Sequence, residues 1–274
     1  MIIWLASYPK SGNTWVRAFL SSYLYGSSNL FNPDLINEIR EFPDHNILNK
    51  FMDSEDFHNL GEISKHWIKV QEFINLKKEI TYLKTHSALC NINGNVFTNS
   101  NNTLVFIYIV RDPRNVVLSL ANHFDETHEE SFKTIVDKRY MIYPKTIEQL
   151  LPSTLVSSWG NHYSSWKNCN SINKIIIKYE DLVNNTKDTF KKIINFLSEH
   201  AEVYYDEKKF INSINCTEFN TLKKHENKHG FNMGQKKKFF HLGKKNDWRN
   251  LLDPKIYEKI NMEFSSEMKE LEYI

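Results

Sequence analysis

Cysteine is scarce in this chain of 274 residues, which contains only three. Cys90, Cys169 and Cys216 have neither the spacing of a zinc site nor that of a disulfide framework. We therefore expect buried or idle thiols in a reducing compartment. With 41% hydrophobic and 25% charged residues, the composition is that of an ordinary globular protein that can bury a sizeable core.

A large excess of one charge is also absent, since the formal net charge is only +2. This balance argues against binding nucleic acid over a broad surface, so any anion site must be local. No apolar run is long enough to span a bilayer. The first predicted strand begins at the first residue and leaves no room for a basic and apolar leader, so we expect a cytoplasmic protein.

Internal repeats and clear linkers are missing as well. The length alone fits one large α/β domain or two small ones. Because the motifs described below are spread from the beginning to the end of the chain, we expect a single α/β domain over residues 1–274.

The strongest local signal lies at residues 8–15, which read Tyr-Pro-Lys-Ser-Gly-Asn-Thr-Trp. An apolar run at residues 1–6 predicts a buried strand before this segment, and apolar residues at helical spacing over 16–24 predict a helix after it. The backbone N–H groups of such a strand–turn–helix unit suit a phosphate. Gly12 lets the backbone approach the anion closely, and Thr14 offers a hydroxyl.

This segment differs from the ATP-binding P-loop, whose pattern is Gly-x-x-x-x-Gly-Lys-Ser/Thr. Asn13 stands where that pattern has its lysine, Lys10 comes earlier, and the first glycine is missing. A nucleotide 5′-phosphate therefore fits the segment better than the γ-phosphate of Mg-ATP. The alternative is a turn that only caps the following helix.

A histidine ends the second predicted strand, at residues 80–86. Ligands of open α/β sheets lie at the carboxyl ends of the strands, so we expect His86 to face the same crevice as Lys10. Because neutral imidazole titrates near working pH, His86 is a candidate general base. The alternative is a structural histidine.

The most apolar strand is predicted at residues 103–110, and a helix is predicted at 115–124. Between them lies Arg-Asp-Pro-Arg, with Pro113 in the first turn of the helix. The guanidinium of Arg111 offers a bidentate fork that suits a phosphate. The alternative is that Arg111 pairs with Asp112 or another local acid.

Residues 8–15 resemble the 5′-phosphosulfate loop of the sulfotransferases that use PAPS (3′-phosphoadenosine 5′-phosphosulfate). Residues 109–124 resemble the 3′-phosphate motif of this family, and Lys-Thr-His at 84–86 is similar to the segment that carries its catalytic base. The resemblance implies a P-loop-kinase-like α/β fold, in which helices flank a central parallel sheet and the phosphosulfate loop follows the first strand. It also puts Tyr179, after a strand predicted at 172–178, beside the adenine.

The resemblance further implies roles for single residues. The implied catalytic residues are Lys10, His86 and Ser119. The implied cofactor-binding residues are Lys10, Ser11, Gly12, Asn13, Thr14, Trp15, Arg111, Ser119, Tyr179, His241, Gly243 and Lys244.

The last motif, at residues 239–248, resembles Arg-Lys-Gly-x-x-Gly-Asp-Trp of the family. The matching residues are Gly243, Asp247 and Trp248. His241 stands where the family has the arginine that binds the 3′-phosphate, and nearby lysines such as Lys244 are candidates to replace it.

Elsewhere, the patterns predict amphipathic helices at residues 64–79, 186–199 and 253–272. The aromatic-rich segment at 151–168 is interpreted as core packing. Residues 26–62 are irregular and polar, and form either a lid or substrate wall or a variable surface loop.

The resulting hypothesis is transfer of the sulfuryl group of PAPS to a hydroxyl, or less readily an amine, of a small-molecule acceptor. His86 would remove the acceptor proton and Lys10 would compensate charge on the departing phosphate oxygen, leaving PAP as product without a metal. We expect no nucleic acid and no membrane span among the partners, and the oligomeric state stays open. Two alternatives are a small-molecule kinase of the same fold and a non-catalytic protein that binds a sulfonucleotide or another anion.

Overall fold

Five parallel strands form the central sheet of this computed structural model, in the order β2-β3-β1-β6-β9. The structure describes residues 1–27, 32–53, 56–143, 152–229 and 247–274. The strands of the sheet are β1 (Ile2–Ser7), β2 (Arg40–Glu41), β3 (Thr81–Thr85), β6 (Thr103–Val110) and β9 (Asn173–Lys178). The winding reverses at β1, because the chain first builds β3 on one side of it and then β6 on the other. Ligands of such sheets bind beyond the carboxyl ends of the strands at this point.

The two faces of β1 bury alternate side chains in two separate cores. Ile2, Trp4 and Ala6 lie in the first core, whereas Ile3 and Leu5 lie in the second. Successive side chains of a strand point to opposite faces, so a strand that is covered on both sides must be apolar throughout. This burial explains the uninterrupted apolar run at the start of the chain.

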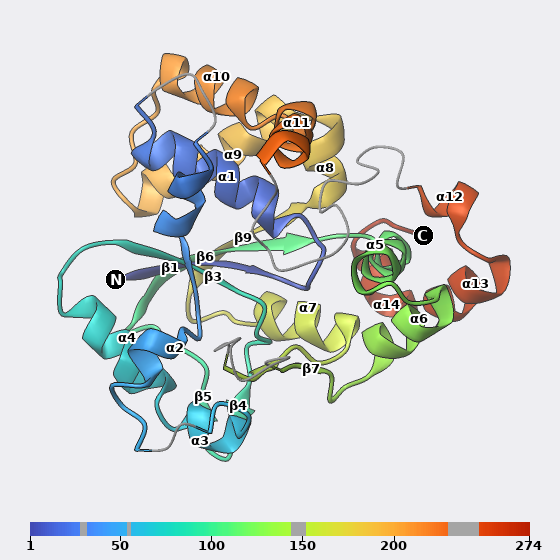
Figure 1. Cartoon of the computed structure of the whole chain (residues 1–274), viewed down its shortest axis with the longest axis horizontal. Helices are drawn as coiled ribbons and strands as arrows, with labels where there is room; N and C mark the ends of the chain where they lie inside the picture. The colour runs from blue at the N-terminus through green and yellow to red at the C-terminus, as the bar shows by residue number, and fades with distance from the viewer. Residues whose placement is uncertain (28–31, 54–55, 144–151, 230–246) are drawn as a thin grey trace.

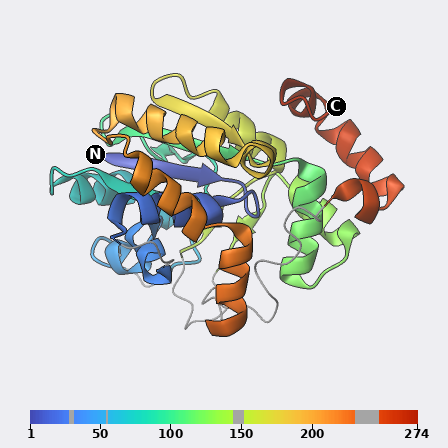
Figure 2. The same ribbon diagram turned by 90° about the horizontal axis from the view of Figure 1, so that it is seen from above.

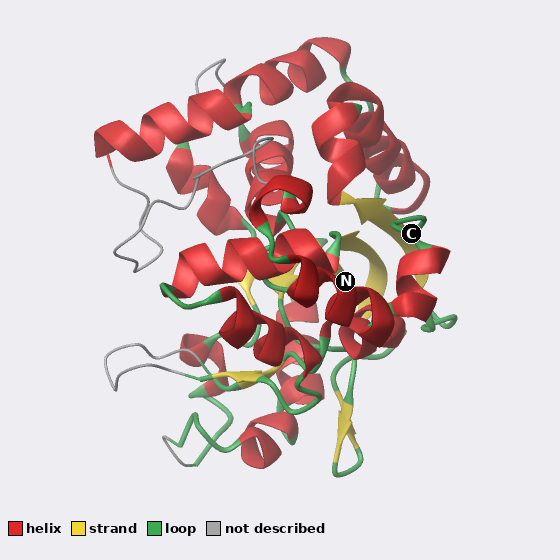
Figure 3. Ribbon diagram, turned by 90° about the vertical axis from the view of Figure 1, so that its right-hand side faces the viewer, coloured by secondary structure: helices red, strands yellow, loops and turns green. Residues whose placement is uncertain are grey.

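Helices cover both faces of the sheet (Figure 1). The second core packs against α1 (Asn13–Tyr25), α9 (Thr186–His200) and α10 (Glu207–Cys216), and the rings of Phe19 and Phe190 stack there at 3.9 Å. The opposite face is covered by α4 (Trp67–Asn75) and α7 (Trp159–Lys167). Figure 3, turned by 90°, shows helices on both sides of the strands. The predicted α/β fold, with helices flanking a parallel sheet, is therefore confirmed.

A second group of helices lies beyond the carboxyl ends of the strands, at the end of the sheet away from the first residue (Figures 1 and 2). It comprises α5 (Pro113–Phe124), α6 (His128–Val136), α12 (Trp248–Leu251), α13 (Pro254–Glu263) and α14 (Ser265–Glu270). The other described elements are η1 (Pro33–Glu38), α2 (His45–Leu48), α3 (Leu60–Ser64), α8 (Tyr179–Asn184), α11 (Phe219–His229), β4 (Asn91–Ile92), β5 (Asn95–Val96), β7 (Met141–Ile142) and β8 (Thr154–Leu155).

The predicted helices and strands agree with the structure where apolar residues recur at a regular spacing over a long segment. The strand predicted at 103–110 is β6, and the helix predicted at 186–199 is α9. The helix predicted at 253–272 is wrong in one respect, because it breaks at Phe264 into α13 and α14. Phe264 leaves helical geometry, with φ of −111° and ψ of 25°, and its buried ring packs against Trp159 at 5.1 Å.

The edge strand β2 was not predicted, because a strand of two residues is too short to show the alternation of apolar and polar residues that indicates a strand. The helix predicted at 64–79 is α4, which is shorter at both ends, from Trp67 to Asn75, and the separate short helix α3 ends at Ser64. Both differences lie in or beside the segment interpreted as an irregular excursion, where short elements depend on tertiary contacts.

The aromatic residues of α7 are buried, which confirms their interpretation as core packing. Two of them also hold the ends of strands through their indole N–H groups. Trp166 donates to the carbonyl oxygen of Ser87 at 3.0 Å, just after β3, and Trp159 donates to that of Arg111 at 3.1 Å, just after β6. These bonds satisfy carbonyl groups that leave the sheet ladder, and they attach α7 to the edge where ligands bind.

No helix in the described part of the chain is long and apolar enough to cross a membrane. The same residues contain no group of three or more His, Cys, Asp or Glu side chains that could hold a metal ion. The three cysteines are free thiols, of which Cys216 is buried and Cys90 and Cys169 are half-buried.

We predict that Trp166→Ala lowers the free energy of unfolding by about 3–5 kcal/mol, because it empties a fully buried site and removes the bond to Ser87. Urea denaturation followed by circular dichroism measures this change. The matched control is Leu76→Ala, whose side chain is 73% exposed and whose loss should change stability by less than about 0.5 kcal/mol. Equal effects of the two substitutions would contradict the role of Trp166 in the core.

Candidate active site

The turn between β1 and α1 has the geometry of an anion site. Lys10 and Gly12 both adopt left-handed backbone conformations, with φ of 67° and 103°, and α1 begins at the next residue, Asn13. The hydroxyl of Ser11 is fully buried in this turn and has no hydrogen-bond partner within the described residues. A buried polar group without a partner is costly, and an anion at the N-terminus of the helix would satisfy it.

Gly12 is required in this turn for two reasons. Its φ of 103° is unfavourable for any residue with a side chain, and a Cβ atom there would lie 2.5 Å from Cδ2 of Tyr179. Tyr179 begins α8 directly after β9, so the sheet itself sets the ring against the turn. The ring also contacts Trp15, edge-on at 6.3 Å between centroids.

Two other residues of the turn are directed into the fold. The side-chain amide of Asn13 donates to the carbonyl oxygen of Leu5 and to the hydroxyl of Ser7, both at 3.1 Å, and only 4% of the residue is exposed. Thr14 is 8% exposed. Asn13 therefore offers an anion its backbone N–H rather than its side chain.

Arg111 does not pair with Asp112, which was the alternative left by the sequence. Asp112 forms a buried ion pair with Arg114, at 2.7 Å between Oδ2 and Nη2. Arg111 instead donates from Nη1 to the carbonyl oxygen of Lys10 at 2.9 Å, and its guanidinium lies 4.2 Å from the centroid of the Tyr179 ring. Its Nε is buried without a partner in the described part of the protein, so a donor is left for a further anion.

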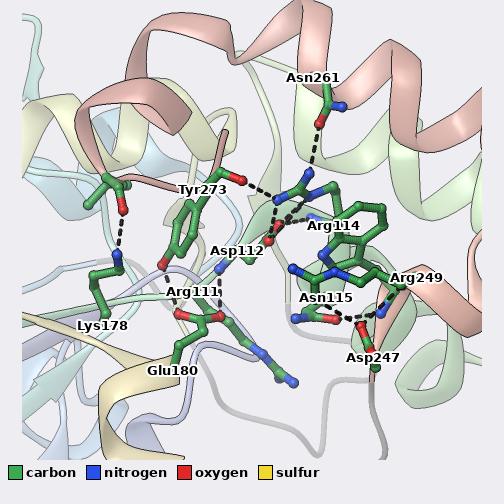
Figure 4. A network of polar contacts seen from close by, with 12 residues as sticks. Arg111, Asp112, Arg114, Asn115, Lys178, Glu180, Asp247, Arg249, Asn261 and Tyr273 are labelled. Carbon is green, nitrogen blue, oxygen red and sulfur yellow. Dashed lines mark hydrogen bonds and ion pairs between the residues drawn. The ribbon is translucent and has the colours of Figure 1, made fainter. Parts of the chain in front are cut away.

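Residues far along the chain hold the Asp112–Arg114 turn in place (Figure 4). Glu180 accepts hydrogen bonds from the backbone N–H of Asp112 at 3.1 Å and from the hydroxyl of Tyr273 at 2.9 Å. Arg114 donates to the carbonyl oxygen of Tyr273 at 2.8 Å and to Oδ1 of Asn261 at 3.2 Å. The turn that follows Arg111 is thus held both by Glu180 of α8 and by residues near the C-terminus.

The described part of the last motif packs against α5. The backbone N–H of Trp248 donates to Oδ1 of Asn115 at 3.0 Å, and its ring lies 3.9 Å from the guanidinium of Arg114. Asp247 caps the short helix α12. The other predicted residues of this motif, His241, Gly243 and Lys244, lie outside the described residues.

His86 follows β3 directly and is held in one tautomer. Its Nδ1 lies 2.8 Å from the carbonyl oxygen of Ser7, and a carbonyl only accepts, so Nδ1 carries the proton and Nε2 has a free lone pair. Burial, and after it the positive charge of Lys84, lowers the pKa of His86 to about 3, while the carboxylate of Glu41 acts in the opposite direction. The imidazole is therefore neutral at physiological pH and able to accept a proton at Nε2.

The surroundings of His86 come from two other elements. Lys84, two residues before it on β3, forms an ion pair of 2.6 Å with Glu41 of β2. His162 of α7 is fully buried and donates from Nε2 to the carbonyl oxygen of His86 at 3.2 Å, while its Nδ1 accepts from the hydroxyl of Tyr108 at 2.8 Å. His162 is a satisfied core histidine that supports the backbone of His86.

Lys10 reaches from the turn toward α5, where its Nζ lies 3.0 Å from Nδ1 of His123. Burial lowers the pKa of Lys10 to about 7, and the nearby guanidinium of Arg111 contributes, whereas Glu226 opposes the change. Ser119 is half-buried on the same side of α5 as His123, since residues four apart on a helix are neighbours. Lys10, His86 and Arg111 thus follow three different strands at one edge of the sheet, and Ser119 lies on the helix α5 that follows Arg111.

A family model described as Sulfotransferase domain matches residues 2–272. The chain belongs to the sulfotransferase family. Among curated relatives, amine sulfotransferase from Oryctolagus cuniculus is 23% identical over 282 residues, which cover 98% of this chain and 81% of the relative. Cytosolic sulfotransferase 5 from Arabidopsis thaliana is 23% identical over 270 residues, which cover 94% of this chain and 76% of the relative.

Solved structures agree with this sulfotransferase fold. Mouse sulfotransferase SULT7A1 complexed with PAP is similar with a TM-score of 0.60 and 21% identity, covering 98% of this chain and 84% of that one. Retinol dehydratase in a complex with retinol and PAP is similar with a TM-score of 0.62 and 15% identity, covering 98% of this chain and 81% of that one. The predicted family and fold are therefore confirmed.

Two residues near the site of this sulfotransferase were missed by the sequence reasoning. His123 lies four residues after Ser119 on a predicted helix, and residues at this spacing lie on the same face, so the sequence alone could have placed His123 beside Ser119. Glu41 had no such signal, because only the pairing of β2 with β3 brings it to Lys84.

We predict that Gly12→Ala destabilises the sulfotransferase more than Gly94→Ala does. Gly94 also has a left-handed φ, of 89°, but a Cβ atom there would meet nothing within 4 Å, so its substitution isolates the backbone cost of about 1–2 kcal/mol. The excess cost at Gly12 comes from the ring of Tyr179. It should therefore disappear when Gly12→Ala is made in a Tyr179→Ala background, as urea denaturation would measure, and an excess that persists there would contradict the steric explanation.

Proposed function

We propose that this sulfotransferase moves the sulfuryl group of PAPS to a hydroxyl of a small-molecule acceptor and releases PAP. One observation carries the proposal: two separate sets of anion donors contact the same aromatic ring. The turn of Lys10 to Gly12 lies against Tyr179, and so does the guanidinium of Arg111. This arrangement suits a nucleotide that has phosphate groups on both its 5′ and its 3′ oxygen.

The 5′ side is assigned to the turn after β1. Backbone N–H groups from Ser11 to Thr14 would hold the 5′-phosphate, and the unpartnered hydroxyl of Ser11 fits an oxyanion there. Lys10 would compensate the charge that develops on the phosphate oxygen as its bond to sulfur breaks. Two PAP complexes among the similar structures support a cofactor of this class.

The 3′ side is assigned to Arg111 and Ser119. The buried Nε of Arg111, which has no partner in the described part of the chain, fits a phosphate oxygen. Tyr179 and Trp15 offer ring surfaces to the adenine. His241, Gly243 and Lys244 remain predictions from the sequence.

His86 is assigned as the general base. As the acceptor oxygen bonds to sulfur, Nε2 of His86 takes the acceptor proton, and the sulfur–oxygen bond to the 5′-phosphate breaks with its electron pair on that oxygen. The neutral state and fixed tautomer of His86 support this role. We also propose that the protein accelerates transfer of the sulfuryl group by orienting donor and acceptor and by stabilising charge, without a metal ion.

An amine acceptor is the second candidate, because one relative is an amine sulfotransferase. A kinase is less well supported, since Asn13 stands in the place of the P-loop lysine and its side chain is bonded within the fold. A screen with matched alcohols and amines of the same carbon skeleton distinguishes the two acceptor classes.

We also propose that residues 1–274 act as one domain in the cytoplasm.

Calorimetric titration with PAP, AMP and ATP tests the cofactor. PAP should bind about 10–100-fold more tightly than AMP, because the 3′-phosphate adds at least one charge-assisted hydrogen bond worth about 1.5–3 kcal/mol. ATP should bind weakly. Arg111→Ala should lower the affinity for PAP by a larger factor than that for AMP, because it removes a donor to the 3′-phosphate as well as the bond that supports the turn at Lys10. A preference of the native protein for ATP would favour a kinase.

Turnover of the His86→Asn variant tests the base. Asparagine can still donate to the carbonyl oxygen of Ser7 but has no acceptor at the position of Nε2, so the rate should fall about 10²–10⁴-fold while PAP affinity is retained. His58→Asn, at an exposed histidine, is the control. Because the pKa of His86 lies near 3, the native rate should not lose this base as pH falls from 7 to 5. A native-like rate in His86→Asn would refute the assignment.

A further inference from the structure

The pair of Lys10 and His123 is a polar contact at the site that the mechanism above does not use. Nζ of Lys10 lies 3.0 Å from Nδ1 of His123, although 113 residues separate them in the chain. An ammonium only donates, so Nδ1 of His123 must accept when Lys10 is charged. If Lys10 is charged, the contact therefore requires an unprotonated Nδ1 on His123.

Both partners are held from elsewhere. Lys10 has a left-handed backbone with φ of 67°, and its carbonyl oxygen accepts from Arg111 at 2.9 Å, so the start of its side chain has a fixed direction. His123 lies in the last turn of α5, and its ring packs edge-on against Phe124 at 4.8 Å. The contact thus joins the turn after β1 to the C-terminal end of α5.

The charge of Lys10 is under opposing influences. Burial and the guanidinium of Arg111 lower its pKa to about 7, and the carboxylate of Glu226 acts in the opposite direction. With such a pKa, an appreciable fraction of the lysine would be neutral in the free protein at physiological pH. A neutral imidazole that accepts a hydrogen bond favours the charged form.

We propose that His123 is a positioning residue that keeps Lys10 charged and directed toward the leaving oxygen of the sulfuryl donor. The inference rests on the proposed function and adds a residue to it. A charged lysine has three N–H donors, and the bond to His123 uses one of them. His123 would then hold the ammonium at one end while the anion binds at the other.

The test uses the full chain and three variants. His123→Phe keeps the ring shape without an acceptor, His123→Ala removes both, and His123→Asn places an amide oxygen near the position of Nδ1. Trace acetylation of the free protein across a pH series, with mass spectrometry of the peptide containing Lys10, measures the midpoint at which this amine loses its proton.

We expect the midpoint of Lys10 labelling to lie about one pH unit lower in His123→Phe and His123→Ala than in the native protein, and near the native value in His123→Asn. Agreement between the two acceptor-free variants separates the lost hydrogen bond from altered packing. An unchanged midpoint in both of them, or a rise, would overturn the proposal.

Kinetics provide the second measurement. In His123→Phe, kcat/KM for PAPS should begin to fall at lower pH than in the native enzyme, with about tenfold loss at pH 8 and recovery at pH 6. Equal loss at every pH would mean a purely structural role and would also overturn the proposal. Labelling needs no turnover, so a native protein that fails to transfer sulfuryl groups would refute the proposed function without deciding the outcome for His123.

Discussion

The contact of Gly12 with the ring of Tyr179 is the constraint on which the candidate site depends. The chain must turn from β1 into α1 beneath this ring, and a Cβ atom at Gly12 would lie 2.5 Å from it. The same ring receives the guanidinium of Arg111, which in turn bonds to the carbonyl oxygen of Lys10. One close approach therefore sets the positions of the turn, the arginine and the lysine together.

Burial controls the chemistry of the two proposed reactive groups. It brings the pKa of His86 to about 3 and that of Lys10 to about 7, which makes the histidine a neutral acceptor and leaves the lysine close to losing its charge. The value for Lys10 suits an anion site, because a bound phosphosulfate would favour the charged amine, whereas the value for His86 keeps its imidazole neutral. Within the described residues, the hydroxyl of Ser11 and the Nε of Arg111 are buried without a hydrogen-bond partner.

The site is supported by elements that contribute nothing to its chemistry. The indoles of Trp159 and Trp166 bond to the carbonyl groups that follow β6 and β3, and His162 bonds to that of His86. Glu180 and Tyr273 brace the turn that carries Arg111 (Figure 4). Most of these bonds connect residues more than 40 positions apart, so the geometry of the site requires the complete tertiary fold.

The sequence by itself determined the four longer strands of the sheet, the helices α1, α5 and α9, the phosphate-binding turn and the family. It could do so because the spacing of apolar residues, glycine and proline acts on the local backbone. Only the tertiary structure decided that Asp112 pairs with Arg114 and not with Arg111, since both arginines lie within two positions of Asp112 in the sequence. The break at Phe264 and the contact of Lys10 with His123 likewise follow from packing between distant segments, which no local pattern encodes.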